Sequence, residues 1–207
     1  MEHYQPQNEG TFSQAVASRR TVYDLENAIP VADAEIEAMI AHTLTHVPSA
    51  FNSQSTRIVL LLNDKADTYW EVARQALKAA MDPARDFTRT SERVDMFKQS
   101  YGTILFFEDE TVLDGLKAKM PKYAEQFVVW SQQANAMHQF AIWTALAERG
   151  IGASLQHNNP IVDEAVKAEF DLPDHWTLVA QMPFGSIATP PEEKEKQPAA
   201  ARMVVKK

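Results

Sequence analysis

The stretch Ser49–Arg57 (SAFNSQSTR) carries more hydrogen-bonding side chains than a connection between two elements needs. It follows His46-Val47-Pro48 and precedes the apolar run Ile58–Leu62. Serine hydroxyls and the amides of asparagine and glutamine both donate and accept hydrogen bonds, so they can line the edge of a heterocyclic ligand. The alternative is that these side chains satisfy only the backbone of their own loop.

Arg19-Arg20 forms a second candidate site, directly after a short stretch with helical spacing. Two guanidinium groups can clamp a phosphate, because each presents a planar fork of N–H donors. A solvated surface pair is the alternative. The net charge of −8 argues against general binding of nucleic acid or anionic membranes, which requires clustered cations. It still leaves room for one basic pocket that holds one phosphate.

The six histidines do not form a recognisable metal set. His42 and His46 lie one helical turn apart, which suits a metal ion, but the sequence shows neither a third ligand nor an HExxH glutamate. His138 lies in an apolar segment, where a hydrogen-bonded core or interface histidine is expected, and His157 lies in a polar turn. The chain has no cysteine, which excludes disulfides, thiolate metal sites and cysteine nucleophiles.

Composition bounds the class of protein. With 207 residues, of which 45% are hydrophobic and 23% charged, the chain is predicted to fold as one globular domain. The motifs GxSxG, GxxxxGK[ST] and GxGxxG are absent, so no motif supports a serine hydrolase, a P-loop enzyme or a dinucleotide-binding Rossmann domain. The N-terminus does not resemble a signal peptide, and no apolar run approaches the roughly 18 residues of a membrane helix. We therefore expect a cytoplasmic protein.

The elements that position these residues alternate along the chain. We predict buried strands at Ile58–Leu62, Thr103–Phe107 and Trp176–Met182, a short strand at Ala153–Leu155 and an added edge strand at Ala201–Val205. Helices are predicted at Thr11–Ser18, from Asp33 as N-cap to before Pro48, at Thr68–Ala80, Val94–Lys98, Tyr123–Arg149 and Ile161–Phe170. The acidic run Glu108-Asp109-Glu110 is predicted to close the second strand, and Pro183-Phe184-Gly185 to form a turn.

The segment Tyr123–Arg149 is apolar on much of its circumference, and Gly150-Ile151-Gly152 is predicted to cap it. Three or four strands cannot cover five or six helices. The surplus of apolar helical surface therefore predicts burial against a second subunit, in an obligate dimer.

Five motifs, taken in order, resemble the FMN-dependent nitroreductase family. Their matches are Arg19-Arg20-Thr21-Val22-Tyr23 with an RRSxR-type start, residues His46–Gln54 with APSxxNxQPW, Gly150–Ser154 with a glycine-bearing turn and strand, Pro183-Phe184-Gly185 with PxG, and Lys194–Pro198 with KxRxP. Thr21 stands for the usual serine, Ser55-Thr56 for Pro-Trp, and Lys196 for arginine. The chain looks most like the branch that includes fungal stress-response members and their bacterial relatives.

This resemblance implies an α+β fold, the three-layer α/β/α nitroreductase fold. A small mixed sheet would be flanked by helices, and the long central helix would lie at the dimer interface. One domain would span residues 1–207, with residues 1–10 flexible. Residues 82–125 would form a variable excursion near the active site, and residues 190–207 a C-terminal extension that packs on the partner subunit.

The resemblance also implies where FMN binds. Arg19 and Lys196, helped by Arg20 or Lys194, would neutralise its phosphate, and cations near the N1–C2 carbonyl would stabilise the reduced anionic ring. The resemblance further assigns Thr21, Tyr23, Ser49, Ala50, Phe51, Asn52, Gln54, Leu155, Gln156 and His157 to the cofactor site, and Gln133 as a further contact. The loop residues would reach a flavin shared with the partner subunit. Phe51, Phe184 or an aromatic of the middle section would provide a stacking wall.

The implied activity is an FMN-dependent reductase. NADH or NADPH would deliver a hydride to FMN N5 and leave, and a nitroaromatic, quinone or related acceptor would then take the electrons, in a ping-pong scheme. No catalytic side chain is predicted, because the flavin carries the hard step. Two alternatives remain open: a flavin-binding sensor with little reductase activity, and a flavin-free structural or regulatory dimer.

Overall fold

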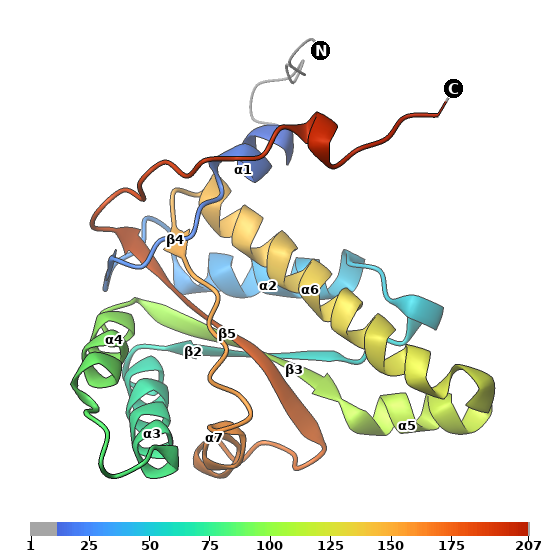
Figure 1. Ribbon diagram of the computed structural model, residues 1–207, viewed down its shortest axis with the longest axis horizontal. Coiled ribbons are helices and arrows are strands. Elements are labelled where there is room, and N and C mark those ends of the chain that lie inside the picture. Colours follow the sequence, from blue (N-terminus) through green and yellow to red (C-terminus); the bar gives the residue numbers. More distant parts are fainter. Residues whose placement is uncertain (1–11, 207) are drawn as a thin grey trace.

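The computed structural model describes residues 12–206 (Figure 1). The predictions for residues 1–10 and for Thr11 lie outside this part of the chain. The helices are α1 (Phe12–Ser18), α2 (Asp33–His46), α3 (Asp64–Ala80), α4 (Thr88–Lys98), α5 (Glu110–Lys119), α6 (Ala124–Glu148) and α7 (Asp163–Glu169). Short 3-10 helices are η1 (Ala50–Asn52), η2 (Pro121–Tyr123) and η3 (Ala199–Ala201).

A five-stranded sheet forms the middle layer, with strand order β1-β5-β3-β2 and with β4 paired to β5. The strands are β1 (Leu25–Glu26), β2 (Thr56–Leu62), β3 (Gly102–Asp109), β4 (Gly152–Ala153) and β5 (Trp176–Ile187). We predicted a mixed sheet, but every ladder between these strands is antiparallel. Parallel pairing among the described residues is confined to the isolated bridge between Thr21 and Ala153.

Strand β3 lies at the centre, and all eight of its residues are buried. Successive side chains of a strand point to opposite faces of the sheet. Ile104 and Phe106 accordingly pack with α2 and α6, whereas Leu105 and Phe107 pack with α3, α4 and α7. Figure 1 shows these two groups of helices on opposite sides of the strands. The predicted three-layer α/β/α arrangement is therefore confirmed.

Strand β2 was predicted to be buried on both faces. Its side chains do pack on both faces, Ile58 and Leu60 against one core and Val59 and Leu61 against the other, but full burial is not observed. Most of its residues are only partly buried, because β2 is the edge of the sheet and pairs only with β3. The periodicity of a short apolar run does not distinguish an edge strand from a central one.

Strand β5 extends five residues beyond its predicted end at Met182. Pro183-Phe184-Gly185 was predicted as a turn, but it lies inside this strand, and Thr103 of β3 pairs with Pro183. Pro183 cannot donate a main-chain hydrogen bond, but its carbonyl accepts one from the Ser154 amide (3.2 Å). The Phe184 side chain is 0% exposed, so its proposed part in a stacking wall is wrong.

Several element ends also differ from prediction. Helices α3 and α4 begin earlier than expected, at Asp64 and Thr88. Asp33 is the first residue of α2 rather than its N-cap, and its carboxylate accepts a hydrogen bond from the Tyr101 hydroxyl (2.5 Å). Glu108 and Asp109 belong to β3 rather than following it. A capping or acidic residue does not define the end of an element from sequence alone, because its side chain can bind a tertiary partner instead, as Asp33 does.

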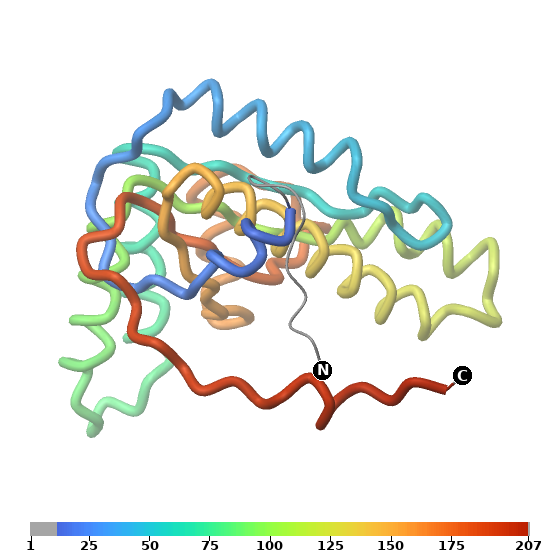
Figure 2. Tube along the Cα trace, turned by 90° about the horizontal axis from the view of Figure 1, so that it is seen from above, coloured from blue at the N-terminus to red at the C-terminus, as the bar shows by residue number. Residues whose placement is uncertain are grey.

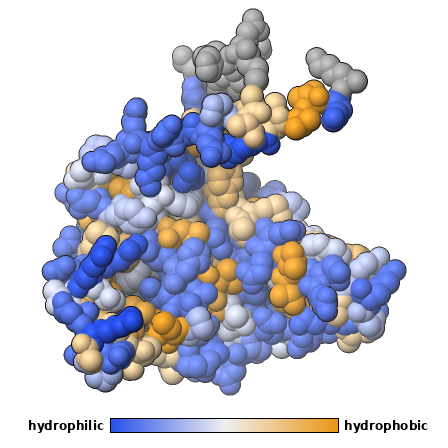
Figure 3. Space-filling view, in the orientation of Figure 1, coloured by the Kyte–Doolittle hydropathy of each residue, from blue (hydrophilic) through white to orange (hydrophobic). Residues whose placement is uncertain are grey.

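Helix α6 spans 25 residues and confirms the long helix predicted at Tyr123–Arg149. Gly150 follows it with a φ of 72°, the left-handed conformation that ends many helices. Ile142 and Leu146 of α6 pack toward the sheet. Its opposite side exposes Val129, Met137 and Phe140. Figure 3 shows hydrophobic patches among hydrophilic surface on the face that α6 crosses.

The predicted edge strand at Ala201–Val205 is wrong. The chain there forms η3 and then continues without a strand partner, which leaves Met203, Val204 and Val205 exposed. Figure 2 shows this C-terminal segment stretched along the outside of the molecule. None of the described helices is both long and apolar enough to cross a membrane.

Candidate functional site

A basic pocket of about 400 Å³ lies where α1 meets the C-terminal segment, and we call it the cation pocket. It is lined by Arg19, Arg20, Thr21, Lys194 and Lys196, with Val16 and Ala17. The backbone beside it is fixed, because the Val22 amide donates to the Ala153 carbonyl (2.9 Å) of β4. The structure thus brings together residues that are more than 170 positions apart in sequence.

The two arginines of this pocket make contacts that do not neutralise their charge. The Arg19 guanidinium lies 4.4 Å from the centre of the Trp143 ring. Arg20 donates to the main-chain carbonyl of Glu192, which ties the C-terminal segment to the end of α1. Among residues 12–206, no ion pair involves Arg19, Arg20, Lys194 or Lys196. Four cations without a carboxylate partner in a concave site suit a phosphate dianion.

The loop Ser49–Gln54 is tightly wound. Phe51, Asn52 and Gln54 have φ angles of 54°, 51° and 49°, in the left-handed region that few residues adopt. The Ser49 hydroxyl accepts a hydrogen bond from the main-chain N–H of Gln54 (3.0 Å), so this side chain does satisfy the loop's own backbone. Asn52 and Gln54 remain exposed. Ser49 and Gln54 line a pocket of about 310 Å³, separate from the cation pocket.

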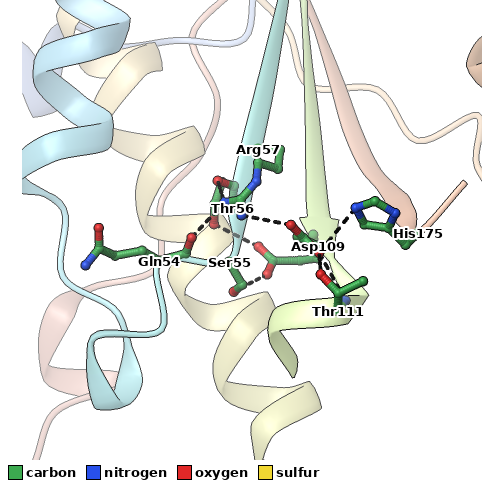
Figure 4. A network of polar contacts seen from close by, with 8 residues as sticks. Gln54, Ser55, Thr56, Arg57, Asp109, Thr111 and His175 are labelled. Carbon is green, nitrogen blue, oxygen red and sulfur yellow. Dashed lines mark hydrogen bonds and ion pairs between the residues drawn. The ribbon is translucent and has the colours of Figure 1, made fainter. Parts of the chain in front are cut away.

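Glu108 anchors the end of this loop, where Figure 4 shows Ser55, Thr56 and Arg57 close to Asp109. The Glu108 carboxylate is fully buried and accepts hydrogen bonds from the Ser55 hydroxyl (2.5 Å), the Thr56 hydroxyl (2.8 Å) and the Asn135 amide (2.8 Å). The Gln139 amide donates to the Asn135 carbonyl oxygen (2.7 Å) and so extends the network along α6. The ion pairs of the described residues include none to Glu108, so hydroxyl and amide donors alone satisfy this carboxylate.

The neighbouring carboxylate, Asp109, anchors the same loop through Arg57. The guanidinium of Arg57 donates to Asp109 (2.8 Å) and to the Gln54 carbonyl (2.7 Å). Desolvation would raise the pKa of Asp109, but hydrogen bonds from Thr111 and the charge of Arg57 outweigh it and lower the pKa below its ordinary value. The His175 imidazole lies 3.8 Å from the same carboxylate.

A second open cavity, of about 440 Å³, lies between the segment after Arg20 and helix α4. It is lined by Tyr23, Arg89, Glu92, Arg93 and Met96. Arg93 connects it to Gln156, whose side-chain oxygen lies 3.4 Å from the guanidinium. Gln156 is nearly buried and pairs with Gln181 of β5 through both main-chain groups.

The remaining predicted residues lie as follows. Ala50 belongs to η1, Leu155 is partly buried, and His157 and Gln133 are exposed. His138 is buried, and its Nδ1 lies 2.8 Å from the Ala134 carbonyl, which confirms a hydrogen-bonded core histidine. The rings of His42 and His46 stack with centres 4.1 Å apart. Residues 12–206 contain no group of three or more potential metal ligands.

Phe51 is 55% exposed and joins an aromatic cluster with Tyr123, Phe127 and Trp130. Its ring centre lies 5.6 Å from that of Phe127 and 5.8 Å from that of Trp130. The cluster packs against Phe51 while leaving more than half of the residue's surface exposed.

The candidate residues therefore fall into three places in one chain: the cation pocket, the cavity beside Tyr23, and the loop Ser49–Gln54. Sequence reasoning missed Arg93, Glu108 and Arg57. Arg93 lies in a stretch of mixed charge that offers no signal. Glu108 did carry a signal in the sequence. It is an acidic residue that directly follows an apolar run, and such a residue lies where a buried strand ends.

The chain is similar in sequence to known nitroreductases. The model of the nitroreductase family matches residues 16–186. The nitroreductase FRM2 of Saccharomyces cerevisiae is 32% identical over 187 residues, which cover 89% of this chain and 92% of that protein.

Solved structures agree. The nitroreductase CinD of Lactococcus lactis, in complex with nicotinic acid, is 41% identical with a TM-score of 0.86, over 95% of this chain and all of CinD. CinD has also been solved with chloramphenicol and with 4-nitrophenol. A protein from Desulfovibrio desulfuricans, solved with FMN, shares the fold at 19% identity, with a TM-score of 0.68 over 95% of this chain and 98% of that one.

Proposed function

This chain belongs to the nitroreductase family, and we propose that it is an FMN-dependent NAD(P)H oxidoreductase that reduces nitroaromatic, quinone or related acceptors. The observation that carries the proposal is the cation pocket. Four cations that form no ion pair within residues 12–206 converge there, although the chain as a whole has a net charge of −8. Such a site suits the phosphate end of FMN, and Thr21 adds a hydroxyl donor.

The chain's own residues would bind and orient the cofactor. Arg19, Arg20, Lys194 and Lys196 would hold the phosphate. Thr21, Tyr23 and the segment Leu155–His157 would extend the site from there, because Thr21 bridges β4 immediately before that segment. The chemistry that FMN supplies when bound is hydride uptake from NAD(P)H at N5, followed by electron delivery to an acceptor. No side-chain acid or base is needed for that exchange.

A homodimer would complete the site. The loop Ser49–Gln54 and the cation pocket are separate within one chain, so the loop of a second copy would cover the flavin bound to the first. The exposed apolar side of α6 and the C-terminal segment would supply the interface. Gln133 lies on that side of α6, one helical turn from both Val129 and Met137. Phe51 would then serve as one wall for a stacked acceptor.

The test is spectroscopic and catalytic. Purified protein should show the visible absorbance of oxidised flavin, or acquire it with added FMN. Anaerobic NADH or NADPH should bleach that absorbance, and menadione or 4-nitrophenol should restore it. A yellow protein that neither nucleotide bleaches would instead indicate a flavin-binding sensor. A protein that binds no FMN would indicate a flavin-free dimer.

A further inference from the structure

Arg93 of α4 reaches two of the residues assigned to the cofactor site, Tyr23 and Gln156. Its guanidinium carbon lies 5.8 Å from the centre of the Tyr23 ring and 5.6 Å from that of Phe97. One guanidinium nitrogen donates to the Gln156 side-chain oxygen (3.4 Å). Aromatic faces attract cations at such distances, so the two rings and the amide hold the charged group over the cavity.

The fold does not account for this arrangement. Arg93 has no carboxylate partner among the ion pairs of residues 12–206. Gln156 is fixed independently, because its side-chain nitrogen donates to the Ser154 hydroxyl (3.0 Å) and its backbone pairs with Gln181. Its oxygen is thereby turned toward Arg93. A preset amide and an uncompensated cation at a cavity form a site for a group with negative charge.

The position of this cavity relative to the cation pocket favours the flavin ring. Thr21 lines the cation pocket and Tyr23 lines the cavity, and the two residues belong to one extended segment. Two extended residues span about 7 Å. A single elongated ligand can therefore place its phosphate in the cation pocket and its ring beside Tyr23. Moreover, the RRSxR pattern ends in arginine where this chain has Tyr23, and Arg93 brings a guanidinium to that position from another element.

We propose that Arg93 is a flavin-binding residue whose guanidinium stabilises the anionic, reduced ring at its N1–C2 carbonyl edge. The inference rests on the proposed function, since it presumes that FMN occupies this site. The negative charge of the reduced ring lies at that edge, and a cation nearby stabilises it more than it stabilises the neutral oxidised ring. Arg93 would thus set the reduction potential, whereas the cation pocket would set the affinity for the phosphate.

The experiment compares the holoprotein with Arg93→Ala, Arg93→Lys and Arg85→Ala. Arg85 precedes α4 and lines neither the cavity nor the cation pocket. Its removal therefore matches the change in net charge. The first measurement is the two-electron potential of the bound FMN. In Arg93→Ala the reduced form should be favoured at least tenfold less than in the parent protein. For a two-electron couple, a tenfold change makes the potential about 30 mV more negative. Arg93→Lys should recover most of the shift, and Arg85→Ala should show none.

The second measurement is the affinity for sulfite, which adds to N5 of oxidised flavin and leaves an anion at the N1–C2 edge. Arg93→Ala should weaken sulfite binding at least tenfold. Because Arg93 is exposed, this variant should keep the unfolding midpoint of the parent. Bound FMN with unchanged potential and unchanged sulfite affinity in Arg93→Ala would overturn the inference. A parent protein that binds no FMN would instead overturn the proposed function.

Discussion

Ser55 and Thr56 direct both of their hydroxyls at one carboxylate, that of Glu108, at 2.5 and 2.8 Å. A carboxyl group with 0% exposure must find its hydrogen-bond partners inside the protein, and here hydroxyl and amide groups provide them. The Pro-Trp of the related motif offers no hydroxyl at either position. The replacement by Ser55-Thr56 is therefore matched to Glu108, and it ties the loop Ser49–Gln54 to β3 and α6.

Thr56→Val tests this anchor, because valine keeps the shape of threonine and removes only the hydroxyl. Glu108 would lose one of its donors while its oxygen stays buried, so we expect a loss of about 1–3 kcal/mol in the free energy of unfolding. Urea unfolding at constant FMN concentration measures it. The control is Thr45→Val, an exposed helical threonine that donates to its own helix (2.9 Å), which should change stability by less than about 0.5 kcal/mol. Equal effects of the two changes would contradict the anchoring role.

Arg19→Ala tests the phosphate assignment. A hydrogen bond to a charged group contributes about 1.5–3 kcal/mol, so removing this partner should weaken FMN binding about 10- to 150-fold. Fluorescence titration of the apoprotein with FMN measures the Kd. Arg202→Ala, on the C-terminal segment and outside the cation pocket, removes the same charge and should leave the Kd unchanged. An unaltered Kd in Arg19→Ala would place the phosphate elsewhere.

At the scale of elements, β5 organises the site because three strands pair with it. β1 and β4 lie along its C-terminal half, and β4 positions Thr21 through the bridge at Ala153. The sequence predicted the core of β5 from its apolar run. It could not predict the extension through Pro183-Phe184-Gly185, since proline and glycine are typical of turns and only a neighbouring strand makes them part of a ladder.

Gly185→Ala should disrupt this junction. A methyl group there would lie 2.4 Å from the Glu26 carbonyl oxygen, closer than atoms can approach, and a main-chain atom of a paired strand cannot move aside cheaply. We expect a loss of stability of about 2 kcal/mol or more, together with weaker FMN retention as β1 separates from β5. The matched change is Gly115→Ala in α5, where nothing lies within 4 Å and alanine should stabilise the helix by about 0.5–1 kcal/mol. Thermal unfolding of both variants distinguishes them, and a stable Gly185→Ala protein would refute the close approach.

At the scale of the whole molecule, local patterning predicted single elements such as α6 and β3, whereas only the resemblance implied their three-layer arrangement. Periodicity could not predict that the candidate residues lie in three separate places, the cation pocket, the cavity beside Tyr23 and the loop Ser49–Gln54. The cation pocket joins Arg19 to Lys196 across the length of the chain, and Arg93 reaches Gln156 from a polar segment without any motif. Contacts between distant segments arise from packing, which a single sequence does not record. Only the resemblance implies that the loop Ser49–Gln54 would serve a flavin bound to another copy, which stays a prediction.

Val129→Asp tests whether a second subunit completes the site. Val129 is 55% exposed on α6, and Gln133 and Met137 follow it along the same side of the helix. A carboxylate buried there by a partner subunit would lack a counter-charge, at a cost of about 3 kcal/mol, so dimerisation should weaken more than a hundredfold. Each monomer would keep its cation pocket but lose the covering loop, and FMN should therefore dissociate along with the dimer. Light scattering combined with visible absorbance measures both. Gln75→Asp introduces the same charge on the exposed surface of α3 and should leave a yellow dimer. A monomer that retained FMN would show that one chain suffices for the site, and a dimer unaffected by Val129→Asp would place the interface away from this side of α6.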